Sequence, residues 1–261
     1  MLYSSSIIKN KKITRSKYDS IVFDDIKTIG SYCLYWGFNQ NNITGSISFP
    51  ELTNIDSYGL HSAFSGCTGI TSVSFPELTS VSTNALYSVF QGCTGITGSV
   101  SFPELTSIRD GGMQYAFQGC TRITSVSFPE LTSVGNYGLN YAFQNCTGIT
   151  SVSFPELTSI GSNGLAYAFL SCTGITSVSF PELTSVGNYG LFYAFQNCTG
   201  ITSVSFPKLT SIGSSGLNYA FRSCTGITEL HFRSDAQSTV EAATGYSTNF
   251  GATNATIYFD L

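Results

Sequence analysis

One nine-residue block, Ser-Val-Ser-Phe-Pro-Glu-Leu-Thr-Ser, recurs along most of the chain and is clearest at residues 72–80. Its phenylalanine recurs at steps of 26, 27, 26, 26, 26 and 26 residues, at Phe49, Phe75, Phe102, Phe128, Phe154, Phe180 and Phe206. A fixed period of this size is typical of repeat proteins in which each repeat is one coil and neighbouring coils stack. The sequence therefore predicts one elongated solenoid rather than several compact domains.

Each repeat predicts a short strand, a turn and a short helix. Residues 72–75 alternate polar and apolar, which is the period of a half-buried strand, and Pro76 ends the strand because it has no backbone N–H. Further along the coil, Leu191, Ala194 and Phe195 have the i, i+3, i+4 spacing of one helix face. We therefore expect an α/β repeat fold, with the phenylalanine of each block buried between a parallel sheet and a layer of short helices.

The two ends of the chain depart from the repeat. Phe23 lies 26 residues before Phe49, which places a divergent first coil near Ser20. Near the C-terminus, residues 256–259 again alternate like a strand. We predict an N-terminal cap, a solenoid of about eight 26-residue coils and a degenerate C-terminal capping coil, at residues 1–19, 20–232 and 233–261.

Two inserted glycines interrupt the repeat without ending it. Gly98 accounts for the single 27-residue step, and Gly45 is inserted at the matching place of an earlier coil. A glycine just before a strand predicts a β-bulge after which the register is regained.

Composition excludes several functional classes. Five of the 11 basic residues lie in residues 1–17, so the rest of the chain carries six basic and 15 acidic residues. Because nucleic-acid binding needs a basic face, we expect no nucleic-acid partner. No apolar run reaches membrane-spanning length, and the N-terminus shows no hydrophobic core of a signal peptide. The low charge, with 10% charged residues, favours an extracellular or cell-surface protein, which we expect to be a monomer.

Stacking turns each repeated surface residue into a row. The serines on the outward side of the predicted sheet include Ser125, Ser127, Ser151, Ser153, Ser177 and Ser179. The acidic row at the end of the block includes Glu104, Glu130, Glu156 and Glu182, and ends at Lys208. It predicts a solvated edge or, alternatively, a surface for cations or a basic partner.

The tyrosine row lies in the predicted helical segment, at Tyr115, Tyr141, Tyr167, Tyr193 and Tyr219. Three earlier coils have Trp36, Ser62 and Ser88 at the same position. The row predicts packing against the next coil or, alternatively, a stacking surface for sugar rings or a partner.

A row of cysteines recurs once per coil, at Cys67, Cys93, Cys120, Cys146, Cys172, Cys198 and Cys224. This spacing differs from that of zinc ligands, so we expect buried, reduced thiols and no metal site. Only His61 and His231 could activate a nucleophile, and neither fits the serine rows in pattern. We therefore expect no catalytic residues, no cofactor and no enzymatic activity.

Longer runs carry a family likeness. Leu157–Gly161, Ala168–Phe169 and Cys172–Pro181 resemble the BspA-like leucine-rich repeat, and the match covers about residues 20–232. The resemblance implies a right-handed, curved solenoid with its sheet on the concave side and short helices on the convex side. It also implies a bacterial or mucosal-protist surface protein, often an adhesin for host matrix or other cells. These coils are about three residues longer than the common form, and no individual binding residue carries over.

Comparison of the coils with one another indicates what such a surface could bind. The predicted sheet face is nearly uniform from coil to coil, which suits a repeating ligand better than one irregular epitope. We therefore predict a non-enzymatic surface recognition or adhesion module for an extracellular protein or polysaccharide. The alternative is a structural spacer or coat element that displays another domain.

Overall fold

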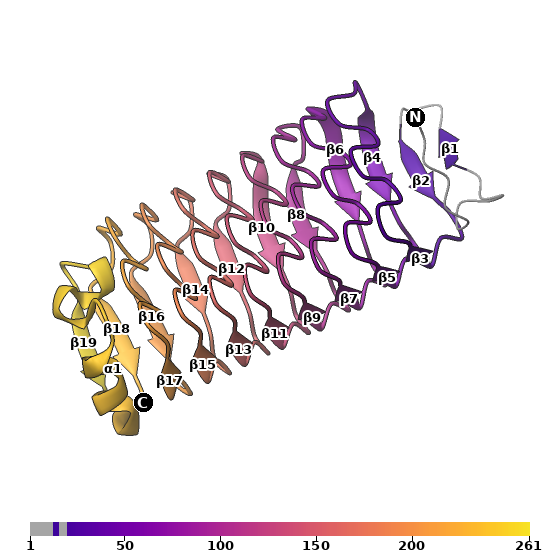
Figure 1. Cartoon of the computed structure of the whole chain (residues 1–261). Coiled ribbons are helices and arrows are strands. Elements are labelled where there is room, and N and C mark those ends of the chain that lie inside the picture. Colours follow the sequence, from indigo (N-terminus) through magenta and orange to yellow (C-terminus); the bar gives the residue numbers. More distant parts are fainter. Residues whose placement is uncertain (1–12, 16–19) are drawn as a thin grey trace.

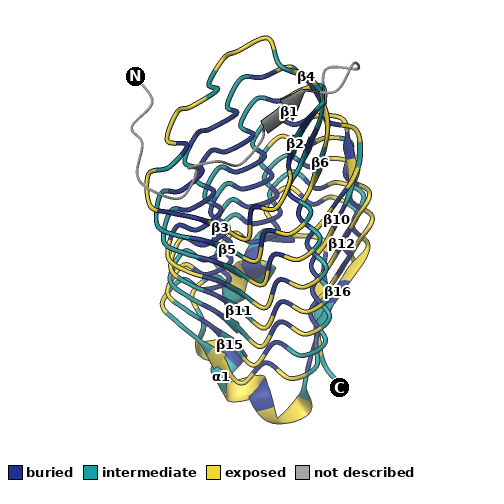
Figure 2. Cartoon of the chain, turned by 90° about the vertical axis from the view of Figure 1, so that its right-hand side faces the viewer, coloured by how far each residue is buried: buried dark blue, intermediate teal, exposed yellow. Residues whose placement is uncertain are grey.

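The chain forms a solenoid of about nine turns in the computed structural model, which describes residues 13–15 and 20–261 (Figure 1). Buried residues line the inside of every coil and exposed residues cover its outer surface (Figure 2). The predicted solenoid of parallel strands is confirmed. Its expected right hand and concave sheet stay predictions.

The longer strands lie on one side of the coils, in three successive sheets. The first contains β1 (Ile13–Arg15), β2 (Ile21–Phe23), β4 (Thr44–Ser48) and β6 (Gly69–Ser74). The second contains β8 (Gly98–Ser101), β10 (Ile123–Ser127), β12 (Ser151–Ser153) and β14 (Ser177–Ser179). The third contains β16 (Ser203–Phe206), β18 (Glu229–Phe232) and β19 (Thr256–Phe259).

After the proline corner of each block, the chain adds a two-residue strand to an eight-stranded parallel sheet. Its members are β3 (Thr28–Ile29), β5 (Asn54–Ile55), β7 (Ser80–Val81), β9 (Ser107–Ile108), β11 (Ser133–Val134), β13 (Ser159–Ile160), β15 (Ser185–Val186) and β17 (Ser211–Ile212). Each coil therefore has two sheet sides that meet at the corner, and a third side that returns the chain to the next coil.

The third side corrects the predicted helices. The segment that holds Leu191, Ala194 and Phe195 is a series of turns, and the single α-helix of the described residues is α1 (Gln237–Ala242), near the C-terminus. Tyr189 and Tyr193 adopt left-handed backbone conformations, with φ of 55° and 52°. A right-handed helix cannot contain such residues.

Backbone hydrogen bonds explain why turns replace the helix. The N–H of Ala194 donates to Leu191 three residues back, at 3.0 Å, whereas that of Phe195 donates to Ala220 of the next coil, at 2.9 Å. Along the segment, the N–H groups alternate between a carbonyl three residues back and a carbonyl of the next coil. Because the next coil supplies the acceptors, the backbone is satisfied without the i−4 bonds of a helix.

Two rows of stacked phenylalanines fill the interior. The phenylalanines of the blocks stack from Phe23 to Phe232 with ring centroids 4.3 to 5.7 Å apart. A second row of phenylalanines runs from Phe38 to Phe221 on the third side of the coils, here called the turn side. Its successive ring centroids are 5.2 to 5.9 Å apart. The rows meet edge to face, as in Phe154 against Phe169 at 6.3 Å. The predicted burial of the block phenylalanines is confirmed.

Both predicted bulges are present. The register between β4 and β6 shifts at Gly45, and that between β8 and β10 shifts opposite Gly98. Both glycines have positive φ, of 78° and 75°, which a residue with a side chain rarely adopts.

The two ends carry different elements. β1 pairs with β2, the one antiparallel pair among the described strands, and the rest of the predicted N-terminal cap (1–12 and 16–19) lies outside the described residues. After β18, the chain forms η1 (Ser234–Ala236), α1 and η2 (Tyr246–Gly251), and β19 then pairs in parallel with β18. Val240 and Phe250 from these elements are buried against the last coil.

Ser153, the last residue of β12, and Phe154, which follows it, give a direct test of this packing. Phe154→Ala should lower the free energy of unfolding by about 3–5 kcal/mol, because it removes a fully buried ring that stacks on both neighbours. Ser153→Ala, one residue away on the exposed face, should change it by less than about 0.5 kcal/mol. Chemical denaturation measures both, and equal losses would contradict the assignment of the strand faces.

Candidate functional site

The outward serines of the longer sheet form a regular array, here called the serine face and consisting of Ser125, Ser127, Ser151, Ser153, Ser177 and Ser179. Register places Ser125, Ser151 and Ser177 in one line across β10, β12 and β14, and Ser127, Ser153 and Ser179 in a second. Parallel strands lie about 4.8 Å apart, so the hydroxyls repeat at that spacing. Five of the six serines are exposed and Ser125 is half-buried, as the alternation predicts.

The hydroxyls of the serine face are available to a ligand. None of the six makes a hydrogen bond to another described residue, and no residue of β8, β10, β12 or β14 is charged. By contrast, the threonine hydroxyls at the strand entrance bond within the solenoid, as in Thr150 to the carbonyl of Thr124 at 3.3 Å. The face is therefore neutral, and its unengaged polar groups are hydroxyls.

The acidic row lies at the corner between the two sheets, directly after the longer strands. Glu104, Glu130 and Glu156 are exposed, as expected for a solvated edge. Glu182 instead forms an ion pair with Lys208, with 2.5 Å between Oε2 and Nζ. The row thus borders the serine face with carboxylates. The last carboxylate, that of Glu182, is neutralised by Lys208.

The tyrosine row lies on the turn side and is stacked. Successive rings from Tyr115 to Tyr219 are 4.5 to 5.4 Å apart, and Arg222 lies 5.8 Å from the ring centroids of both Tyr193 and Tyr219. Burial raises the pKa of Tyr141 most, and the neighbouring tyrosines add to the effect. The pKa is about 12, so this phenol stays protonated. The predicted packing against the next coil is present. The phenylalanine core separates this row from the serine face, so the structure does not bring the two together.

The cysteine row consists of free thiols, as predicted. The seven cysteines of the row are buried, whereas Cys33 is partly exposed. Each buried thiol donates to a phenylalanine carbonyl of the preceding coil, as in Cys146 to Phe117 at 3.1 Å. Burial raises the pKa of these thiols, to about 12 at Cys224. Among the described residues, no group of three or more His, Cys, Asp or Glu side chains could hold a metal ion.

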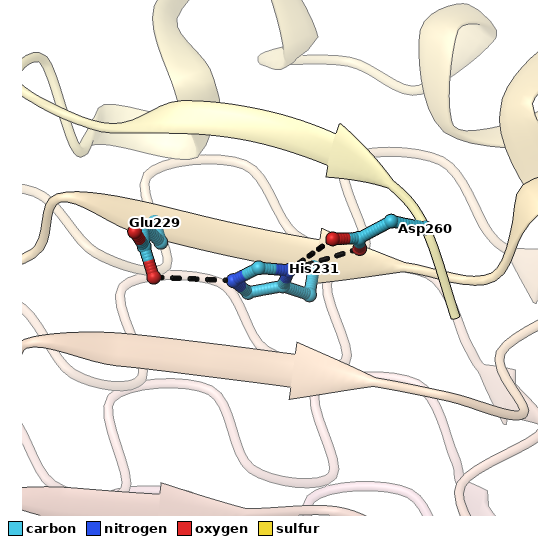
Figure 3. Close-up of polar contacts among 3 residues, drawn as sticks. All are labelled: Glu229, His231 and Asp260. Atoms are coloured by element: carbon cyan, nitrogen blue, oxygen red, sulfur yellow. Dashed lines mark hydrogen bonds and ion pairs between the residues drawn. The ribbon is translucent and has the colours of Figure 1, made fainter.

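One polar cluster was missed by sequence reasoning. His231 on β18 lies between Asp260 and Glu229, with its Nδ1 2.9 Å from Asp260 Oδ1 and its Nε2 3.3 Å from Glu229 Oε2 (Figure 3). The hydrogen bond that His231 donates to Asp260 raises the pKa of the imidazole most, and the contact with Glu229 raises it further. The sequence signal was the replacement of both serines of the block by Glu229 and His231.

The cluster also corrects one expectation about histidines. In register, His231 stands beside Ser205 of β16, so one histidine does lie next to a serine row. Both of its ring nitrogens face carboxylates, which favour the imidazolium. The three side chains form an ionic closure at the end of the last sheet, between β18 and the residue after β19.

Two further features complete the surface of the described residues. A hollow of about 580 Å³ lies along β9, β11 and β13 beside Arg109 and Asp110. No helix among the described residues, 13–15 and 20–261, is long and apolar enough to cross a membrane.

Comparison with known proteins decides the family. The model of the BspA type leucine-rich repeat region, which comprises six copies of the repeat, matches residues 4–89, 27–163, 87–215 and 139–254. These matches span most of the chain. This chain belongs to the BspA-type leucine-rich repeat family.

One solved structure supports the fold of this BspA-type protein. A leucine-rich repeat protein of T. pallidum, at 16% identity, aligns over 98% of this chain and 99% of its own with a TM-score of 0.53. A leucine-rich cell surface protein of Faecalibacterium prausnitzii A2-165, at 14% identity, aligns over 89% and 82% with a TM-score of 0.29. A search of curated proteins gave no match. Because many functions share one fold, the ligand must be argued from the side chains.

Thiol labelling tests the burial of the cysteine row. Without denaturant, a maleimide should modify Cys33 first, because the thiolate is the nucleophile and the other seven thiols are buried with raised pKa. After unfolding, all eight should react. Rapid labelling of Cys146 in the native protein, located by mass spectrometry, would contradict this.

The closure of the last sheet should depend on pH. Because the folded pKa of His231 is raised, its contribution to stability is complete below the unfolded value of about 6.5 and is lost as the pH rises through the folded value. Asp260→Asn should lower the pKa of His231, measured by NMR titration, and weaken this pH dependence. His61, whose pKa is lowered by burial, serves as the internal control and should not change. A wild-type His231 that titrates at or below about 6.5 would contradict the assignment.

Proposed function

We propose that this BspA-type chain is a non-enzymatic recognition or adhesion module of a cell surface, working outside the cell as a monomer. Its serine face binds a repetitive ligand, either a glycan or a fibrous matrix protein. The observation that carries the proposal is the array of six hydroxyls on β10, β12 and β14. They are in register, five of the six serines are exposed, and none of the hydroxyls has a hydrogen-bond partner among the described residues.

A repeating ligand suits this face better than a single compact one. Each coil presents the same two serines, and each pair forms one weak subsite at the strand spacing. A polymer that occupies one subsite presents its next unit to the neighbouring subsite at high effective concentration. Affinity then grows with the number of coils rather than with the quality of any one contact.

The charges around the face restrict the ligand further. The face itself is neutral, and carboxylates of Glu104, Glu130 and Glu156 border it at the corner. An acidic polysaccharide would meet this border with like charge, which costs affinity. The arrangement therefore favours a neutral glycan or a matrix protein with basic side chains at its margin.

A deletion in register tests the distribution of binding. Glycan and matrix-protein arrays first identify the ligand. Removal of residues 125–176 then joins Thr124 to Ser177 and takes out two coils while keeping both ends of the solenoid. This variant should bind at least tenfold more weakly, whereas Ser151→Ala with Ser153→Ala in the full-length chain should lose less than about threefold. A shortened, folded solenoid that binds as before would overturn the distributed mechanism.

Substitutions that add negative charge to the serine face, or to the short-strand sheet as a control, can show which face binds the ligand. Ser127→Asp, Ser153→Asp and Ser179→Asp together should abolish binding, because they put three carboxylates in one line of the neutral face. The matched control is the same change at Ser133, Ser159 and Ser185, which are in register on the short-strand sheet. Equal effects of the two sets, with unchanged thermal unfolding, would exclude the serine face. If the arrays show no ligand at all, the role of a structural spacer is favoured instead.

A further inference from the structure

The tyrosine row is interrupted in two adjacent coils. Ser62 and Ser88 stand where the later coils have tyrosine, between Trp36 on one side and Tyr115 on the other. The backbone is the same at all four positions, with φ of 52°, 50°, 56° and 58°. Only the side chains differ, so two rings are missing from an otherwise continuous stack.

The missing rings leave a hollow of about 290 Å³, here called the slot. Trp36 and Tyr115 line it from the coils at either end, and the buried Ser62 and Ser88 lie at its base. The volume is at the lower limit of small-molecule pockets, which span about 300–1,000 Å³. The slot therefore suits a ligand of one or two small rings.

Aromatic and uncharged polar groups share the lining. His61 and Tyr87 stack on each other at 4.5 Å on one flank. On the other flank, the hydroxyl of Ser65 lies 3.4 Å from the carbonyl of Gln91, and the side-chain amide of Gln91 donates to Gln118 at 2.5 Å. The Oε1 of Gln91 makes no hydrogen bond within the described residues.

The slot contains no charged side chain. Its lining has no Asp, Glu, Lys or Arg, and burial lowers the pKa of His61, which keeps the imidazole neutral at pH 7. A charged ligand would lose its hydration here without gaining an ion pair, so phosphates, carboxylates and ammonium groups are disfavoured.

We propose that the slot binds a neutral saccharide of one or two pyranose rings. The negative face of an aromatic ring attracts the weakly positive C–H groups on a pyranose face, while serine and glutamine groups meet the hydroxyls at its edge. The ligand rings occupy the space of the two missing tyrosine rings. Among the described residues, two adjacent coils lack the ring at this one place, unlike the repeated subsites of the serine face.

The aromatic surface continues beyond the slot into the first coil. Tyr32, Tyr35 and Trp36 are 57%, 45% and 52% exposed, which is unusual for large rings at one place. Tyr35 lies 4.7 Å from His61 and 6.3 Å from Trp36, so these rings join the slot without a break. A longer neutral oligosaccharide could extend over them from its bound end.

The inference does not rest on the serine face. The slot is on the turn side, behind the phenylalanine core, and uses none of the serines or glutamates discussed above. Either site can bind without the other.

Trp36 provides a built-in reporter, because it is the single tryptophan of the chain. The purified full-length protein is titrated with maltose, cellobiose and N,N′-diacetylchitobiose, with sialyllactose as a charged comparison. At least one neutral disaccharide should change the Trp36 emission with a dissociation constant of about 1 mM. Saturation-transfer NMR on the same samples identifies which sugar protons contact the protein.

Variants then locate the site. Ser88→Tyr places a ring where Tyr115 has one, at nearly the same φ, so the variant should fold and should bind at least tenfold more weakly. Gln91→Ala, at a half-buried position, should weaken binding without adding bulk. Tyr193→Ser, which removes a ring elsewhere in the row, is the matched control and should bind as the wild type does.

Three results would overturn the proposal. They are no response to any of the three neutral disaccharides, unchanged binding by folded Ser88→Tyr and Gln91→Ala, or tighter binding of N-acetyltyrosine amide than of every sugar. The last result would identify the slot as a site for an aromatic side chain of a protein partner.

Discussion

The fold depends on the hydrogen-bonded register between coils. No coil can bury its own apolar side, and alternate N–H groups of the turn segment find their acceptors only in the next coil. The same register pairs the strands of both sheets and stacks the phenylalanines at nearly constant spacing. A shift by one residue would break the ladders, the aromatic stacks and the thiol bonds together, which is why inserted residues are confined to bulges at Gly45 and Gly98.

Because the register is fixed, each position in the repeat becomes a row, and a departure from the row becomes a local feature. Lys208 ends the acidic row with an ion pair, and Glu229 and His231 replace the serines in β18, the strand before β19. Ser62 and Ser88 open a slot in a stack of tyrosines. Because the other coils are nearly identical, these few substitutions make the surface of one end of the solenoid different from that of the other.

The sequence was sufficient to predict the strands, the buried phenylalanines and the bulges. In a stacked repeat, polar–apolar alternation indicates a strand, proline indicates its end, and an inserted glycine indicates a bulge. It was insufficient for the turn side. The spacing of Leu191, Ala194 and Phe195 fits a helix and also fits turns whose left-handed residues recur every fourth position. A usable signal was the residue before each cysteine of the row, which is Gly, Asn or Ser and has positive φ, as at Gly119 and Asn145. The contact between His231 and Asp260 could not be predicted. Residues 233–255 do not follow the repeat, so the sequence does not show which residues of β19 pair with β18.

The turn side also explains how a repeat can gain a specific site without losing stability. The row position is held in the left-handed region by bonds to the next coil, and tyrosine, tryptophan and serine all occupy it with nearly the same φ. Removal of two rings therefore leaves the backbone and the phenylalanine core unchanged. On the serine face, where we propose binding by repeated subsites, the opposite holds, since a single changed subsite would add little. The two sides thus suit different tasks: the repeated face can supply avidity along a polymer, and the slot can supply selectivity for one chemical unit at one end of the solenoid.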